Sequence, residues 1–176
     1  MCIFVSEKTI MKLAEAKEKY VQTWGMLASN WGINRTMAMV HALLLASGKP
    51  LSTDEIMEAL MISRGNANMN LRDLIGWGII RKEIIRGERK EYFVAEKDIW
   101  FLFKQILKER RKREIEPVIS SIEELRTIDE KGPETDEFIK LMSDMLNVTS
   151  KINNIMDLAI KSDEHWLLGK ITNLIK

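Results

Sequence analysis

Apolar residues recur at helical spacing over most of the chain. They predict an amphipathic helix over Glu7–Ala28 and a second, more uniformly apolar helix over Thr36–Ala46, a pattern typical of a helix buried on most sides. Asn34 is the expected N-cap of the second helix, because its side chain can accept a hydrogen bond from an exposed backbone amide. The N-terminal part of the chain is therefore predicted to be helical.

Two serines mark the starts of the next helices. Ser52 and Glu55 have the spacing of a capping box, in which each side chain satisfies a free amide of the other residue, and a short helix, Thr53–Leu60, is expected there. Ser63 is the expected cap of a further helix, Arg64–Trp77. The tight turn between the two helices predicts a helix-turn-helix.

The period of the pattern changes after this pair of helices. Ile79–Ile85 and Glu91–Val94 are rich in β-branched and aromatic residues, and the segment between them contains a turn glycine, Gly87. This combination predicts a β-hairpin.

The rest of the chain is again helical. A long helical pattern runs from Asp98 to about Arg126, and Pro117 within it predicts a kink or a break near Glu116, because proline donates no backbone hydrogen bond. A turn is expected at 129–133. Two further helices are predicted after it: Thr135–Ile160 and Glu164–Ile175.

This order of elements predicts a mainly α fold. Three helices and a hairpin make a winged helix-turn-helix domain with a β-hairpin wing, and the helices at both ends are expected to form a dimerisation module. Residues 31–97 would then be the winged domain. Residues 1–30 and 98–176 would be the N-terminal and C-terminal dimerisation regions.

Composition narrows the class of protein. The 176 residues are 45% hydrophobic, and the single cysteine, Cys2, cannot form an internal disulfide, which fits a reducing cytoplasm. No apolar run approaches the ~20 residues that span a bilayer, and the first residues are too few for a secretory signal. We therefore expect a cytoplasmic protein with no membrane partner.

The helix predicted at Arg64–Trp77 has one apolar and one polar side. Ala67, Leu71 and Leu74 fall within about 40° of one direction on a helical wheel and are expected to face the core. The opposite side collects small, polar or flexible residues: Gly65, Asn66, Asn68, Met69 and Arg72. This side is predicted to enter the major groove of DNA.

The residue types on this helix suit base recognition. Asn66, Asn68 and Asn70 lie within five residues, and an asparagine can bond the N6/N7 edge of adenine through two hydrogen bonds. Arg64 or Arg72 could bind guanine or a phosphate in the same groove. The alternative interpretation is a polar face that is only solvated.

Charge is unevenly distributed, although the chain carries only +1 overall. Residues 63–90 hold seven basic and three acidic side chains, whereas residues 117–176 hold seven basic and eleven acidic ones. A basic region remote from an acidic one fits a DNA-binding protein with a separate dimerisation module. Three cations at the hairpin tip are expected to contact phosphates: Arg86, Arg89 and Lys90. The alternative is a charged edge that only prevents aggregation.

A second basic run, Lys108–Arg113, lies within the long helical pattern. We expect a solvated face with pairs such as Glu109 with Arg113, four residues apart. Contact with flanking DNA is the alternative.

Several segments follow a known pattern: 31–35, 62–74, 77–80, 87–92 and 109–114. In these segments the chain resembles the GbsR branch of the MarR superfamily of winged-helix transcription regulators. The likeness extends over about residues 15–126 and is most specific through 62–92. At Asn34 the branch usually has proline.

The resemblance implies a homodimeric transcription regulator on double-stranded DNA, and we expect a repressor. Its terminal helices would entwine, and two recognition helices would bind a pseudo-palindromic operator with half-sites ~10 bp apart. The resemblance assigns these residues to the major groove: Ser63, Arg64, Gly65, Asn66, Asn68, Met69 and Arg72. It assigns these to the wing: Arg86, Arg89 and Lys90.

Release by a small organic effector is a further expectation. Some members of this branch resemble sensors of quaternary ammonium compounds such as choline. Trp24, Trp31 and Trp100 could form an aromatic cage for such a cation. Ordinary packing of these aromatic rings, and a pocket for a different apolar effector, are the alternatives.

Catalytic and metal-binding patterns are not found in the sequence. The two histidines, His41 and His165, are far apart, and His41 is expected to be a hydrogen-bonded core residue. Without a phosphate loop or a nucleophile elbow we expect neither a cofactor nor an enzyme. The alternative to DNA binding is a winged-helix adaptor that binds proteins of the transcription machinery, for which more exposed aromatic residues are expected.

Overall fold

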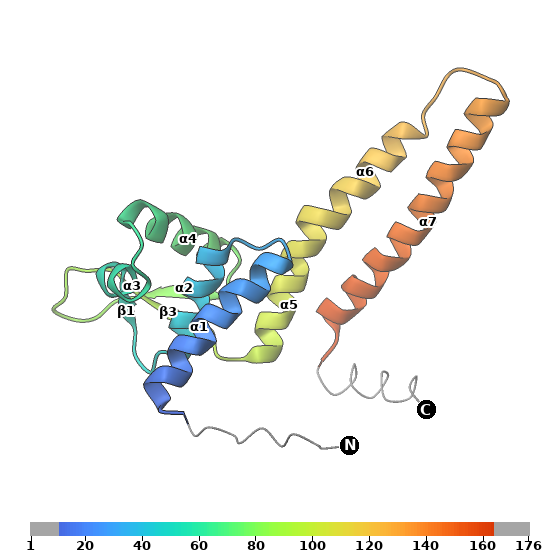
Figure 1. The fold of residues 1–176 in the computed structure, drawn as a ribbon. Coiled ribbons are helices and arrows are strands. Elements are labelled where there is room, and N and C mark those ends of the chain that lie inside the picture. The colour runs from blue at the N-terminus through green and yellow to red at the C-terminus, as the bar shows by residue number, and fades with distance from the viewer. Residues whose placement is uncertain (1–10, 164–176) are drawn as a thin grey trace, which may run out of the picture. The chain divides into compact units, whose positions relative to one another are not determined.

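The structure, a computed structural model, describes residues 11–163. These residues divide into two compact units, the first ending at Lys97 and the second beginning at Asp98 (Figure 1). The elements of the first unit are α1 (Leu13–Asn30), α2 (Arg35–Ala46), β1 (Leu51–Ser52), α3 (Thr53–Leu60), α4 (Arg64–Gly76), β2 (Ile80–Glu83) and β3 (Tyr92–Ala95). Those of the second are α5 (Ile99–Arg110), a π-helical turn (Arg111–Ile115), α6 (Glu116–Leu125) and α7 (Pro133–Lys161).

The first helix starts later than its apolar pattern predicts. Lys12 has an extended backbone with ψ of 149°, so α1 begins at Leu13. Residues 7–10 of the predicted helix lie outside the described residues. α1 packs closely on α2 at Gly25, where a Cβ atom would come within 2.6 Å of Met39 Cγ. An alanine at this crossing would therefore force the Met39 side chain to move.

The predicted cap of α2 is confirmed. Asn34 Oδ1 accepts a hydrogen bond from the backbone amide of Met37 at 3.0 Å, and the helix begins at Arg35, one residue before its predicted start. At its other end, Lys97 Nζ donates hydrogen bonds to three carbonyl oxygens, those of Leu44, Leu45 and Ser47. A cation at this position stabilises the free carbonyls at the end of a helix.

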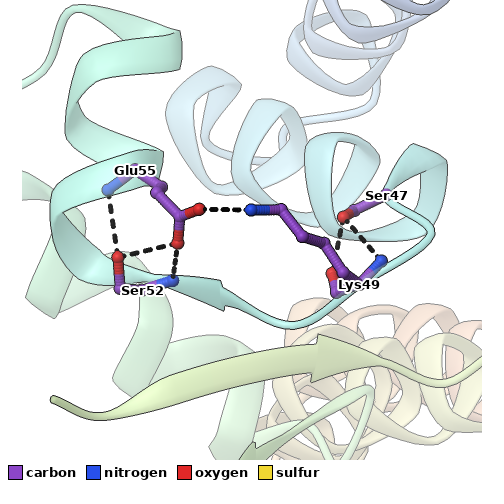
Figure 2. A network of polar contacts seen from close by, with 4 residues as sticks. All are labelled: Ser47, Lys49, Ser52 and Glu55. Carbon is purple, nitrogen blue, oxygen red and sulfur yellow. Dashed lines mark hydrogen bonds and ion pairs between the residues drawn. The ribbon is translucent and has the colours of Figure 1, made fainter. Parts of the chain in front are cut away.

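A polar network fixes the start of α3 (Figure 2). Ser52 Oγ accepts from the amide of Glu55 at 3.3 Å, and the Glu55 carboxylate accepts from the amide of Ser52 at 2.7 Å, so the predicted capping box is confirmed. Lys49 Nζ also donates to Glu55, and Ser47 Oγ holds the backbone of Lys49. Hydrogen bonds from Lys49, and then from Ser52, lower the pKa of Glu55 to about 2.

The helix-turn-helix forms as predicted. Met61 adopts a left-handed conformation that ends α3, and Ser63 Oγ then accepts from the amide of Asn66 at 3.3 Å to cap α4. α4 ends at Gly76, one residue before its predicted end, and Gly78 follows with φ of +70°. The three residues predicted to face the core are all buried: Ala67, Leu71 and Leu74.

The hairpin belongs to a small antiparallel sheet with the strand order β1-β3-β2. Leu51 of β1 and Lys82 of β2 both pair with Phe93 on β3. β1 was not predicted, because two residues are too short to show strand alternation. β2 is shorter than the predicted segment 79–85, and β3 has the predicted length but begins one residue later than the predicted segment 91–94. Ile84 lies outside the strands and is 94% exposed, because the chain leaves the sheet at the wide connection toward Gly87.

The second unit contains the long helical pattern and the helix after it. The kink or break predicted near Glu116 takes the form of the π-helical turn Arg111–Ile115, directly before α6. Pro117 provides the reason, because it lacks the amide that would continue the regular ladder. α6 and α7 then pack side by side as an antiparallel pair (Figure 1). The helix predicted at 164–175 lies outside the described residues.

Together these elements confirm the predicted fold class, a mainly α protein with a winged helix-turn-helix and flanking helices. The dimerisation roles expected for residues 1–30 and 98–176 stay predictions. Among residues 11–163, no helix is both long and apolar enough to cross a bilayer.

Candidate nucleic-acid interface

The outward side of α4 carries most of the residues predicted to read DNA. Ser63, Arg64, Gly65 and Arg72 are exposed, and Met69 is 49% exposed. Two more positions on this side are half-buried: Asn66 and Asn68. Opposite this side, the buried Leu71 and Leu74 hold the helix against the core of the first unit. The predicted division of α4 into an inner and an outer side is therefore present.

The three asparagines of α4 do not share one environment. Asn70 is only 1% exposed, and its Nδ2 donates to the backbone oxygen of Asn66 at 2.8 Å and to its Oδ1 at 2.7 Å. Asn70 is therefore a core residue and cannot reach a base. The side chain of Asn68, in contrast, makes no hydrogen bond to any residue within 11–163. Helical spacing already left Asn70 out of the outward set, but only the structure shows that Asn70 engages Asn66 and leaves the side chain of Asn68 without a hydrogen bond to the described residues.

An acidic residue of α3 joins the recognition helix to the wing. The Asp54 carboxylate pairs with Arg64 on α4 and, at 3.0 Å, with Lys90 Nζ at the base of the hairpin. Hydrogen bonds from Lys90, and then from Arg64, lower the pKa of Asp54, while Asp54 raises the pKa of Lys90. Both cations are thus held in place at the rim of α4.

These groups border a small polar depression of about 200 Å³. Its walls come from the start of α3, from α4 and from the end of the hairpin: Ser52, Thr53, Asp54, Arg64, Asn68, Lys90 and Glu91. The free carboxamide of Asn68 and the two cations paired with Asp54 therefore lie in one concave surface. No simple signal in the sequence pointed to Asp54, because a first-turn aspartate is ordinary in a helix.

The wing carries two further cations. Arg86 and Arg89 are exposed, and neither has an ion-pair partner within residues 11–163. Gly87 between them has φ of +90°, a conformation that favours glycine and turns the chain at the tip. The predicted wing residues therefore differ: Lys90 is paired with Asp54, and the two arginines are available to a ligand.

The basic run on the second unit is mainly structural. Arg113 pairs with Glu109 at 3.3 Å, as predicted for a solvated helix face. Arg111, however, is only 26% exposed in its side chain, and it bonds Asn153 at 2.9 Å and Asp157 at 2.7 Å on α7. The interpretation as a wholly solvated face is thus wrong for Arg111, because α7 packs against this position.

The three tryptophans predicted to form a cage lie in both units. Trp24 is 38% exposed on α1 and packs against Tyr20 with ring centroids 5.6 Å apart, and Trp31 follows the end of α1. Trp100 belongs to the second unit, where it stacks on Phe103. The cage remains a prediction.

A larger cavity of about 640 Å³ opens between α1, α2 and α3, and none of these tryptophans lines it. Its apolar lining includes Val21, Leu43, Leu51 and Leu60, and its rim includes Glu55 of the capping network. The volume lies within the range of small-molecule sites.

His41 is buried as predicted, at 5% exposure, but its Nε2 has no hydrogen-bond partner among residues 11–163. Burial, and then the nearby charge of Lys97, lower the pKa of His41 to about 4. The imidazole is therefore neutral at physiological pH. Within the described part of the chain, no cluster of histidine, cysteine and carboxylate side chains could hold a metal ion.

The helix-turn-helix, its exposed polar helix and the hairpin beside it define a winged-helix fold of the transcription-regulator type. No protein-family model matches the chain. Over 112 residues, 64% of the chain, it is 24% identical to the HTH-type transcriptional repressor GbsR of Bacillus subtilis strain 168. A crystal structure of a transcriptional regulator superposes on 81% of the chain, and 98% of that protein, with a TM-score of 0.53 and 20% identity.

These findings confirm the resemblance to GbsR-like regulators that residues 62–92 predicted. The matched part of the chain spans 62% of the length of GbsR, less than two thirds. The structural likeness concerns the fold.

Proposed function

We propose that this protein is a sequence-specific, double-stranded DNA-binding transcription regulator that acts as a homodimeric repressor. One observation carries the proposal: α4 presents a free carboxamide, Asn68, between cations that Asp54 holds in place, on a helix whose other side is buried. Preplaced donors of this kind suit the edges of bases in the major groove. The likeness to a transcriptional repressor supports the same conclusion.

The residues divide into two roles. Asn68 binds a base, with adenine as the best match, and Arg64 binds a guanine or a phosphate beside it. Asn66 has its Oδ1 engaged by Asn70, so it contributes chiefly its Nδ2 as a donor. The remaining outward residues complete the major-groove surface: Ser63, Gly65, Met69 and Arg72. The wing contributes Arg86, Arg89 and Lys90 to the phosphates.

A protein-binding adaptor is less well supported. The outward side of α4 carries a single large apolar residue, Met69, and no aromatic side chain, whereas protein interfaces are enriched in aromatic anchors.

Selection of genomic fragments by the purified full chain tests the proposal. We expect recovery of a pseudo-palindrome with half-sites ~10 bp apart, bound by two copies of the chain. Recovery of fragments without a common sequence would contradict a sequence-specific regulator.

Replacing Arg86 and Arg89 with alanine is expected to weaken binding to every duplex sequence alike. Each phosphate contact that is lost should flatten the dependence of log K on log salt by about 0.9. Fluorescence anisotropy titrations at several salt concentrations measure this slope. The matched control replaces Lys12, directly before α1, and Lys19 on α1 with alanine, which removes the same charge elsewhere. An unchanged slope in the hairpin variant would mean that the wing does not bind DNA.

We further propose that a small apolar effector binds the cavity between α1, α2 and α3 and releases the operator. The cavity borders the capping network that positions α3, so a ligand there can shift the helix-turn-helix. Filling it with Ala59→Trp is expected to abolish both ligand-induced stabilisation and ligand-induced release, whereas Lys19→Trp, outside its lining, should retain both. Thermal-shift and anisotropy assays measure the two effects. Full ligand response in Ala59→Trp would exclude this cavity.

A further inference from the structure

α7 carries two neighbouring rows of side chains along its 29 residues. The inner row packs toward α5 and α6 and is buried or half-buried: Ile139, Met142, Leu146, Thr149, Asn153 and Met156. The outer row is apolar and lies one residue before each of these positions: Phe138, Leu141, Met145, Val148, Ile152 and Ile155. Each residue of this outer row is 38–67% exposed.

The outer row has the spacing of a coiled-coil seam. Its steps alternate between three and four residues over the whole length, which places its members at the a and d positions of successive heptads. α6 adds exposed Val118, one residue before the half-buried Ile119, and in antiparallel helices the same offset turns both rows to one side. The apolar outer row of α7 is thus joined on this side by Val118 of α6.

We propose that a second copy of this chain covers this face, with the two α7 helices antiparallel about a twofold axis between residues 146 and 147. This inference rests on the proposed function, whose homodimer it specifies. The half-exposed side chains of the face offer on the order of 700 Å² of apolar surface, close to the roughly 800 Å² that each partner buries in a standard interface.

The spacing of the outer row selects one register. In an antiparallel pair, an a residue of one helix packs on a d residue of the other. Phe138 then meets the partner's Ile155, Leu141 meets the partner's Ile152, and Met145 meets the partner's Val148. The twofold axis repeats each layer, so every member of the row has a counterpart. A shift by one heptad would leave two residues of each chain uncovered.

Charge complementarity supports the antiparallel direction. Asp144 and Lys151 lie directly before Met145 and Ile152, which occupy a positions. Both charged residues are exposed and have no ion-pair partner within residues 11–163. The proposed register places Asp144 beside the partner's Lys151, and symmetry forms this pair twice. In a parallel pair these flanking positions would face the uncharged inner row of the other helix, so no ion pair would form.

Cysteine cross-linking tests the direction and the register. In a Cys2→Ser background, the double variant Leu141→Cys with Ile152→Cys is expected to form a disulfide-linked dimer on mild oxidation. The two single variants serve as matched controls and should stay uncross-linked, because only a parallel pair brings each position next to its own copy. Cross-linking of the single variants, or none in the double variant, would overturn the proposal.

Charge reversal provides a second measurement on the uncross-linked protein. By sedimentation equilibrium, Asp144→Lys should raise the dimer dissociation constant at least several-fold, and adding Lys151→Asp should restore it. A monomeric native protein, or no restoration, would contradict the interface. Specific DNA binding is measured in parallel. A dimer that binds its operator but fails both tests refutes only this interface. Cross-linking of the double variant without operator binding refutes only the proposed function.

Discussion

Replacing Arg64 or Asn68 with alanine is expected to weaken operator binding by about 1–3 kcal/mol for each side chain. Asn68 has the one carboxamide on the outward side of α4 that makes no hydrogen bond to the described residues, so its removal deletes contacts to a base. Arg64 is paired with Asp54, and the Arg64→Ala variant should lose DNA contacts that depend only in part on the base sequence. Anisotropy titrations with the selected operator and with a scrambled duplex separate the two effects.

The control variants replace the same residue types on the second unit, Asn147→Ala and Arg126→Ala, both exposed. They should bind operator like the native protein. The loss in Asn68→Ala should be confined to the operator, and that in Arg64→Ala should extend in part to the scrambled duplex. Unchanged operator affinity in both α4 variants, with native folding, would refute the assignment of α4 as the recognition helix.

Acidification is expected to destabilise the first unit through His41. The pKa of this histidine is about 4 in the folded protein because of burial, against about 6.5 in the unfolded chain. The unfolded chain therefore binds more protons as the pH falls from 6.5 toward 4. This additional proton binding by the unfolded chain lowers the free energy of unfolding at pH 4.5 by about 2–3 kcal/mol relative to pH 7.

Denaturant titrations at pH 7 and pH 4.5 measure the change. His41→Gln should reduce the difference between the two pH values, even if it lowers stability at both, while His165→Gln serves as the control. Glu55, whose pKa is about 2, loses its stabilising pairs only below about pH 4.5, so its effect falls in a separate window. An equal pH dependence in His41→Gln and the native protein would contradict this prediction.

Caps and turns were the most predictable features. Ser52, Glu55 and Ser63 act on residues within three positions along the chain, so their hydrogen bonds follow from local spacing. The buried side of α4 was equally predictable, because a helix of known period fixes which residues share a face. The ends of the first helix and of the hairpin strands were predicted less accurately, since several weak interactions compete at the end of an element.

Contacts between distant segments could not be predicted in this way. The pairing of Asp54 with Arg64 and Lys90 joins three elements, and Arg111 reaches α7 more than forty residues further along the chain. Lys97 closes the end of α2 across about fifty residues. Each of these residues is of a type that is usually exposed, so the neighbouring sequence gives no sign of its long-range contact.

The amino-acid sequence by itself determined the helices, the hairpin, the face of α4 that turns outward and the resemblance to GbsR-like regulators, because these depend on the period and local chemistry of short segments. Only the tertiary structure decided which asparagine of α4 is free, which cations are already paired and which face of α7 is left uncovered. These outcomes depend on what packs against each residue, and that is set by segments far away in the chain.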